Sequence, residues 1–254
     1  MMKAQDLAID VDGRRLVSDV SFTLERGQIL ALAGASGIGK SLIAAAILGM
    51  LPRGGRRGGT LLLDGETMTD ARLRAARGRR IALAPQPLSS LDPSARIDDQ
   101  FRWAARRAGL SGAACKAAPA AALARLGLPE RTSSLYPHHL SGGMARRILL
   151  GIATVGRPQV LIVDEPTSGL DRAAIDHVAG DLSRLASDGC ALLVITHDLV
   201  FASGLADRIA VLSPDRFAAP MPASAFVADG ADIPDAQARR LWRATPANGM
   251  TVDA

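Results

Sequence analysis

The chain has 254 residues, of which 48% are hydrophobic, and its formal net charge at pH 7 is +5. This size and composition allow a sizeable buried core, and two distant cysteines argue against a disulfide framework or a structural zinc site. The longest apolar stretch, residues 42–51, is about half the ~20 residues that a membrane-spanning helix needs, and the acidic start is unlike an export signal.

Short apolar strands alternate with helical segments outside residues 94–156, which is typical of an α/β fold. Residues 20–25 alternate apolar and polar side chains and predict a strand with one exposed face. Residues 28–34 predict a buried strand, and residues 42–50 predict a helix that is buried almost all round. Further strands are predicted at residues 60–64, 81–84, 160–163 and 191–196, and a solvated helix end is predicted at residues 73–80.

Strand signals disappear between residues 94 and 156, where alanine-rich helices are predicted at residues 97–108 and 117–126. Pro119 near the start of the second helix and Gly127 after its end are typical helix punctuation. We therefore expect an α/β core over residues 1–93 and 157–213, and a helical subdomain over residues 94–156. The tail from Pro214, residues 214–254, is expected to be a loose cover with one helix at residues 236–242 and no chemistry.

A glycine-rich loop follows the buried strand and opens the next helix. Its residues are Gly34, Ala35, Ser36, Gly37, Ile38, Gly39, Lys40 and Ser41, with Leu42 directly after them. This is the phosphate-loop pattern in its required strand–helix context, in which backbone N–H groups surround the phosphates. Lys40 is predicted to reach the β- and γ-phosphates, and the Ser41 hydroxyl is predicted to bind Mg²⁺.

Two acids, Asp164 and Glu165, end the apolar strand that begins at residue 160. Ligands of open α/β sheets bind at the carboxyl ends of strands. After a phosphate loop, the pattern predicts that Asp164 holds Mg²⁺ and that Glu165 orients and polarises the attacking water. By itself it also fits a strand followed by an acidic turn.

The segment Leu140-Ser141-Gly142-Gly143 precedes a helix predicted at residues 144–155. Ser141 can cap that helix, and the glycines expose N–H groups at its positive end. The segment predicts a second anion site, although an ordinary Ser/Gly helix cap has the same sequence.

Together these segments resemble the nucleotide-binding domain of ABC transporters. The phosphate loop, Gln86 after a strand, residues 140–143, the strand to Glu165, the loop at residues 168–171 and His197 after a strand occur in the order and spacing of that family. The resemblance covers about residues 5–213. It implies a P-loop NTPase core of ABC type, with an antiparallel β edge and an inserted helical subdomain.

The resemblance also implies a head-to-tail pair of such domains that encloses two molecules of ATP with Mg²⁺. Gln86 would contact the Mg²⁺ or water region and relay its state to a membrane subunit, and Asp171 would touch the opposite subunit. His197 would hold the γ-phosphate and support Glu165. The signature segment, which would act on the opposite subunit's ATP, consists of Leu140, Ser141, Gly142, Gly143 and Met144. The catalytic residues would be Glu165, His197, Lys40 and Gln86. The metal ligands would be Ser41, Gln86 and Asp164.

Within the family, residues 136–144, 90–93 and 164–168 are similar to the peptide and nickel importer branch. The short chain and its lack of late cysteines resemble the nickel-type ATPase subunit most. A phosphonate-metabolism ATPase of the same branch and a soluble, non-transport ABC ATPase are the alternatives. The branch implies two permeases, a second, unlike ATPase subunit and an extracellular solute-binding protein, with the chain held by the permeases at the cytoplasmic face of the inner membrane. No nucleic-acid partner is expected, because the arginines are scattered and only 3% of residues are aromatic.

Two positions depart from the family pattern. The aromatic residue that usually stacks on the adenine falls by spacing at Val11, so we expect weak base selectivity. The branch usually has Gln-Arg shortly after the signature methionine, where this chain has Arg146-Arg147. Arg146 is expected either to meet a phosphate or carboxylate across the interface or to be solvated.

Overall fold

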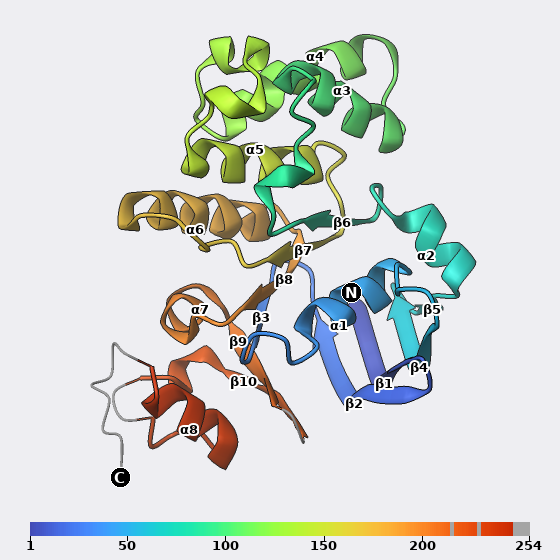
Figure 1. Ribbon diagram of the computed structural model, residues 1–254, viewed down its shortest axis with the longest axis vertical. Helices are drawn as coiled ribbons and strands as arrows, with labels where there is room; N and C mark the ends of the chain where they lie inside the picture. Colours follow the sequence, from blue (N-terminus) through green and yellow to red (C-terminus); the bar gives the residue numbers. More distant parts are fainter. Residues whose placement is uncertain (214–215, 228–229, 246–254) are drawn as a thin grey trace. The chain divides into compact units, whose positions relative to one another are not determined.

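The computed structural model describes residues 1–213, 216–227 and 230–245 and has the α/β fold that the sequence predicts (Figure 1). The chain divides into two compact units, which we describe separately. The first comprises Met1–Arg74 and the described part of Ala191–Ala254, and the second comprises Ala75–Cys190.

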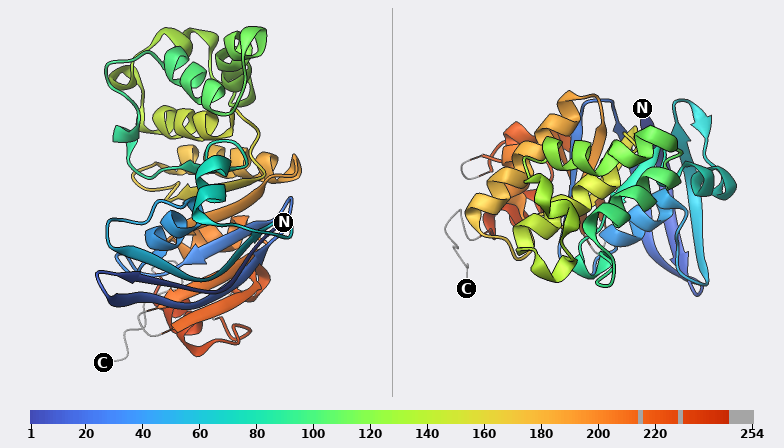
Figure 2. Two further views of the ribbon diagram at one scale, coloured as in Figure 1. Left: turned by 90° about the vertical axis from the view of Figure 1, so that its right-hand side faces the viewer. Right: turned by 90° about the horizontal axis from the view of Figure 1, so that it is seen from above.

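An antiparallel sheet opens the first unit. It contains β1 (Met2–Val11), β2 (Arg14–Leu24), β4 (Gly55–Leu63) and β5 (Glu66–Thr67), in the order β2-β1-β4-β5. Figure 2 shows β1 and β2 as a long, curved pair. The strands predicted at residues 20–25 and 60–64 correspond to the carboxyl-terminal parts of β2 and β4. Strand β1 was not predicted from the sequence. Its pairing shifts register between Ala4 and Leu7, and Asp6 has φ 49°, so this irregularity breaks the alternation of buried side chains.

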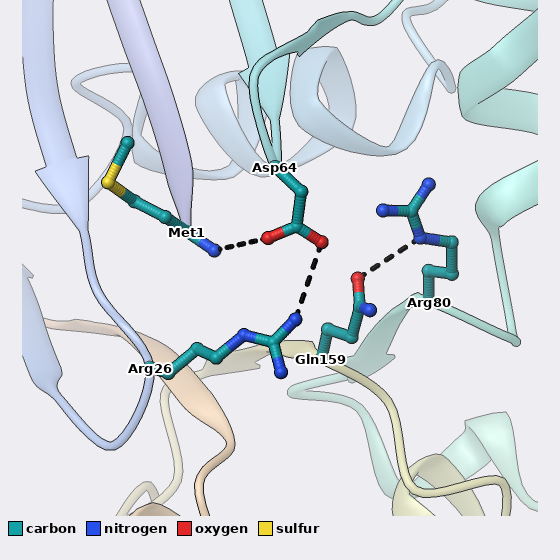
Figure 3. Close-up of polar contacts among 5 residues, drawn as sticks. All are labelled: Met1, Arg26, Asp64, Arg80 and Gln159. Atoms are coloured by element: carbon teal, nitrogen blue, oxygen red, sulfur yellow. Dashed lines mark hydrogen bonds and ion pairs between the residues drawn. The ribbon is translucent and has the colours of Figure 1, made fainter.

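The turn between β4 and β5 is held by polar contacts of Asp64 (Figure 3). Its carboxylate accepts a hydrogen bond of 2.8 Å from the Met1 amine and lies 3.5 Å from a guanidinium nitrogen of Arg26. Figure 3 also draws a contact of the second unit, in which Arg80 Nε donates to Gln159 Oε1 at 3.0 Å. The backbone N–H groups of Gln159 and Val160 donate to the Arg80 carbonyl as well, so this contact joins the starts of β6 and β7.

Parallel strands carry the phosphate loop in the first unit. β3 (Ile29–Ala33) pairs in parallel with β8 (Ala191–Thr196) and with β9 (Arg208–Ser213). Every residue of β3 and β8 is buried, as is typical of strands covered on both faces. Helix α1 (Lys40–Leu48) follows β3, and α7 (Leu199–Leu205) follows β8. The predictions at residues 28–34, 42–50 and 191–196 are confirmed to within a few residues.

The described part of the tail is packed, so the expectation of a loose cover is wrong. β10 (Arg216–Pro222) pairs antiparallel with β9, and a short η4 (Ala223–Ala225) and α8 (Ala236–Arg243) follow. Phe226 and Trp242 contact edge to face, with ring centroids 5.8 Å apart, in a cluster that includes Ala31 and Ala33 of β3. Pro214 and the last nine residues, 246–254, lie outside the described residues.

The second unit combines a parallel strand pair with the predicted helices. β6 (Ile81–Ala84) pairs with β7 (Val160–Asp164). Helix α2 (Asp70–Ala76) precedes β6 in the chain, and its residues up to Arg74 belong to the first unit. The longer helices are α3 (Ile97–Arg107), α4 (Gly112–Arg125), α5 (Gly142–Thr154) and α6 (Arg172–Ser187). Short 3₁₀ turns are η1 (Leu88–Ser90), η2 (Glu130–Ser134) and η3 (Pro137–His139). Phe101, Leu123 and Ile148 bring α3, α4 and α5 into one hydrophobic cluster.

Helix α4 begins earlier than predicted, at Gly112, so Pro119 lies inside the helix and not near its start. Pro119 is buried, and its missing N–H costs the helix one backbone hydrogen bond.

Both cysteines are buried free thiols, and burial raises the pKa of Cys190 to about 12, so this thiol stays neutral at physiological pH. Among the described residues, no helix has the length and hydrophobicity needed to cross a bilayer.

Candidate functional site

The glycine loop between β3 and α1 has a shape that only glycine accommodates at two positions. Gly34 has φ +156°, and a Cβ there would collide with the carbonyl oxygen of Leu212. Gly39 has φ +109°, and a Cβ there would lie 2.9 Å from Cγ2 of Val17. The loop therefore lies directly against β2 and β9, which hold its backbone in place.

Lys40 turns its ammonium group back over this loop. The residue is 6% exposed, and Nζ donates to the carbonyl oxygens of Gly34 at 2.7 Å and Ala35 at 2.9 Å. Ser41 follows on an exposed position in the first turn of α1. A positive group and a helix N-terminus thus face the same short loop, which is the arrangement that binds phosphate.

His197 directly follows β8, the strand that pairs with β3 before the glycine loop. The parallel register pairs Ala33 with Thr196, so Gly34 and His197 both follow the carboxyl ends of neighbouring strands. The buried Thr196 accepts a hydrogen bond of 3.0 Å from the N–H of Asp198, and Asp198 caps α7 through the N–H of Phe201. These bonds fix the backbone on both sides of His197, whose side chain is exposed.

A second group of predicted residues lies at the carboxyl ends of β6 and β7 in the second unit. The register pairs Ala84 with Val163, so Gln86 and the two acids follow the same edge of this strand pair. Glu165 is 7% exposed and has φ +47°, a left-handed conformation that is costly for a residue with a side chain. Such strain persists only where the surroundings enforce it, and it is concentrated at functional sites.

Arg146 joins this group, and the expectation that it is solvated is wrong. It is 6% exposed, and its Nη1 donates to the carbonyl oxygens of Pro85 at 3.0 Å and Gln86 at 2.6 Å. Burial lowers the pKa of Arg146 from its ordinary value, and the nearby charges of Asp164 and Glu165 act in the opposite direction. The sequence signal was present, since Arg146 departs from the family pattern, but its partners are about sixty residues away in the chain.

The predicted signature segment forms the start of α5. Ser141 caps the helix and accepts a hydrogen bond of 3.2 Å from the N–H of Met144, as expected, and Gly142 and Gly143 lie in the first turn. A Cβ on Gly143 would lie 3.1 Å from Cβ of Ala174 in α6. Asp171 caps α6 through the N–H of Ala174 at 2.8 Å. The N-terminal ends of two helices therefore lie close together in the second unit.

The predicted residues thus form two groups, one in each unit. In the first unit, Lys40 and Ser41 follow the glycine loop and His197 follows the neighbouring strand β8. In the second unit, Gln86, Asp164 and Glu165 lie at the carboxyl ends of β6 and β7. Val11 ends β1 half-buried, paired with Arg14 and Gly55, and base selectivity stays a prediction. Among the residues that the structure describes, no three His, Cys, Asp or Glu side chains cluster as the ligands of a metal ion.

The model of the ABC transporter family matches residues 17–168, more than half of the chain. The chain belongs to the ABC transporter family. This match contains the glycine loop, Gln86, the signature segment and both acids. The predicted family and the ABC-type fold are therefore confirmed.

Curated relatives of this ABC family member are ATP-binding proteins of peptidoglycan transport, oligopeptide transport and nickel import. The peptidoglycan transport ATP-binding protein YejF of Agrobacterium fabrum is 37% identical over 79% of the chain and 38% of its own length. The oligopeptide transport ATP-binding protein OppD of Salmonella typhimurium is 33% identical over 79% of the chain and 62% of its own length. The nickel import ATP-binding protein NikD of Pseudomonas putida is 33% identical over 88% of both chains. The chain thus spans 38% and 62% of the lengths of the first two relatives. The predicted resemblance to the peptide and nickel importer branch is confirmed.

Solved ABC structures have the same fold. The ATP-binding subunit of an ABC transporter superposes with a TM-score of 0.74 at 28% identity, covering 89% of this chain and 91% of its own. The cbiO1 subunit of Clostridium perfringens, part of the complex cbiONQ, superposes with a TM-score of 0.75 at 25% identity over 88% of both chains.

Proposed function

We propose that this chain is the ATP-hydrolysing subunit of a bacterial ABC importer, and that it couples ATP binding and hydrolysis to uptake of nickel or peptides through partner permeases. The observation that carries the proposal is the ammonium of Lys40, held over a glycine loop at the carboxyl edge of parallel strands. In an ABC family member, that loop is the expected place of the ATP phosphates. The names of the relatives support the transport role and the choice of cargo.

Mg²⁺ fits the predicted ligands chemically. The Ser41 hydroxyl, the Gln86 amide oxygen and the Asp164 carboxylate are hard oxygen donors, which is the type that Mg²⁺ prefers together with phosphate oxygens. When bound, Mg²⁺ would neutralise charge on the β- and γ-phosphates. The family pattern assigns these three residues as the ones that would hold it.

The residues of the chain would divide the remaining work. Lys40 would bind the β- and γ-phosphates, and His197 would hold the γ-phosphate from the neighbouring strand. Glu165 would orient the attacking water and accept its proton. Phosphoryl transfer needs mainly in-line placement and neutralisation of charge, so these fixed positions would supply much of the catalysis.

Partners would complete the site. The segment from Leu140 to Met144 would face the ATP of an opposite, unlike ATPase subunit, and Asp171 would contact that subunit beside it. Two permeases would hold the pair at the cytoplasmic face of the inner membrane, near Gln86 and the helical subdomain, and an extracellular solute-binding protein would deliver the cargo. The proposed divisions remain the α/β core at residues 1–93 and 157–213, the helical subdomain at 94–156 and the tail at 214–254.

The lysines of the chain provide a matched test of this proposal. The purified protein is expected to release phosphate from MgATP, and Lys40→Ala should abolish release and weaken nucleotide binding, because the charge facing the phosphates is lost. Lys116→Ala removes an exposed lysine of α4 and should leave both unchanged. Phosphate release and binding of a fluorescent ATP analogue measure the two effects. Wild-type turnover by Lys40→Ala would disprove the proposed site.

A further inference from the structure

Arg146 connects the signature helix α5 to the segment that follows β6. Its Nη1 donates to two successive carbonyl oxygens, 3.0 Å from that of Pro85 and 2.6 Å from that of Gln86. These carbonyls belong to the two peptide units on either side of the Gln86 Cα. Holding both units fixes the backbone dihedral angles of Gln86, and these angles set the direction in which its exposed side chain leaves the backbone.

The local sequence gives the backbone few other means of attachment. Residues 85 and 87 are prolines and have no N–H group, so Gln86 has the only backbone donor of these three residues. The carbonyl groups are then the main backbone groups through which this segment can be held. A guanidinium suits this task, because its planar array of donors reaches adjacent acceptors without losing its charge.

Burying this charge is costly, so it must be compensated locally. Arg146 is 6% exposed, and its Nε has no hydrogen-bond partner among the described residues. The two carbonyl oxygens and the nearby carboxylates of Asp164 and Glu165 provide the negative potential that keeps the cation in place. Arg146 therefore contacts or faces Gln86 and both acids while it is anchored in α5.

We infer that Arg146 is a positioning residue. Its clamp, the two hydrogen bonds to the carbonyls of Pro85 and Gln86, aims the Gln86 side chain and links it to the signature helix, near the acids at the end of β7. Its effect on hydrolysis rests on the proposed function, whereas its effect on the backbone after β6 does not. If Gln86 acts near Mg²⁺ and the attacking water, loss of the clamp misplaces a group in the transition state and leaves binding at the glycine loop intact. The expected signature is a lower kcat with a nearly constant KM for ATP.

Amide hydrogen exchange and steady-state kinetics on the full chain test this inference together. Arg146→Met keeps the apolar stem and removes the donors, and Arg146→Lys keeps the charge with one donor group. We expect Arg146→Met to speed exchange at residues 86–91 at least tenfold and to lower kcat about tenfold or more, with KM within about twofold. Arg146→Lys should recover part of both effects, and exchange in α3 should stay unchanged in each variant.

Arg147→Met is the matched control. Arg147 lies on the same helix but pairs with Asp181, at 3.1 Å, and not with the segment after β6. This change should lower stability without speeding exchange at residues 86–91 or lowering kcat more than about twofold. If Arg146→Met does not fold, Arg146→Gln takes its place with the same expectations.

The outcomes separate the two proposals. Unchanged exchange at residues 86–91 in the Arg146 variant would overturn the inference, and so would an equal effect of Arg147→Met. Faster exchange in a protein without any ATPase activity would support the clamp and reject the proposed function. Faster exchange with unchanged kcat would overturn the link between the clamp and hydrolysis.

Discussion

At the residue scale, Glu165 combines burial with an unusual backbone conformation. The sequence predicts an acid after a buried strand, and the structure adds that this acid is 7% exposed, with φ +47°. A Pro at position 166 follows, and the N–H of Ser168 donates to the Glu165 carbonyl at 3.3 Å, so a tight turn enforces the conformation. The turn therefore fixes the backbone from which the Glu165 side chain projects.

Replacing Glu165 by Gln tests its role as the group that orients the water. The amide keeps the shape and the backbone conformation but cannot accept a proton, so hydrolysis should fall roughly 10²–10⁴-fold while ATP binding persists. Single-turnover phosphate release and equilibrium ATP binding measure the two steps. The control is Glu130→Gln at an exposed position of η2, which should hydrolyse ATP at the wild-type rate. A rate within twofold of wild type for Glu165→Gln would remove Glu165 from the proposed mechanism.

At the scale of elements, α8 and β10 brace the strand that leads into the glycine loop. Trp242 of α8 is 4% exposed and packs edge to face on Phe226, in the same cluster as Ala31 and Ala33 of β3. Asp235 caps α8 by accepting from the N–H groups of Gln237 and Ala238, which holds the helix in place for this packing. Part of the tail therefore belongs to the core of the first unit.

Trp242→Ala should destabilise the protein by about 3–5 kcal/mol, because it removes a large buried ring and leaves a cavity behind β3. Denaturant unfolding followed by circular dichroism measures the change. Val227→Ala is the control, since Val227 is 52% exposed beside Phe226 and should change stability by less than about 0.5 kcal/mol. Equal unfolding midpoints for wild type and Trp242→Ala would show that the tail does not stabilise the fold.

At the scale of the whole molecule, the family resemblance is the reason why we expect a partner. The signature segment lies at the capped start of α5 and Asp171 caps α6, both in the second unit, and Ser141 and Asp171 are exposed. In the proposed pair, each ATP takes the loop from one subunit and the signature segment from the other. One chain by itself would then leave each site incomplete.

Purification with and without the products of neighbouring genes tests the proposed heteromer. We expect the chain by itself to hydrolyse ATP slowly, and the rate to rise at least tenfold when an unlike ATPase subunit and permeases are present. ATPase rates, with masses from light scattering, give the readout. A complex that carries Lys40→Ala in this subunit controls for activity of the partner. Full activity of this chain as a homodimer, with no gain from other subunits, would contradict the model.

Local patterns predicted much of the fold and most of the candidate site. The strand at residues 81–84 matches β6 at both ends, and the strand at residues 160–163 lacks only Asp164 of β7. The glycine loop lies between a strand and a helix, and Ser141 caps α5, as predicted. These features depend on interactions within a few residues, so hydrophobic periodicity, glycines and capping residues suffice to find them.

Tertiary structure decided the features that depend on distant parts of the chain. Strand β10 forms by pairing with the edge of β9, and the tail is packed through the hydrophobic cluster that contains Trp242. Neither feature is predicted by a local hydrophobic pattern. Arginine is usually a surface residue, yet carbonyl groups about sixty residues earlier in the chain and the acids at the end of β7 make a buried position favourable for Arg146. A charge is buried only where distant groups compensate for the lost water, and those groups are brought together by folding.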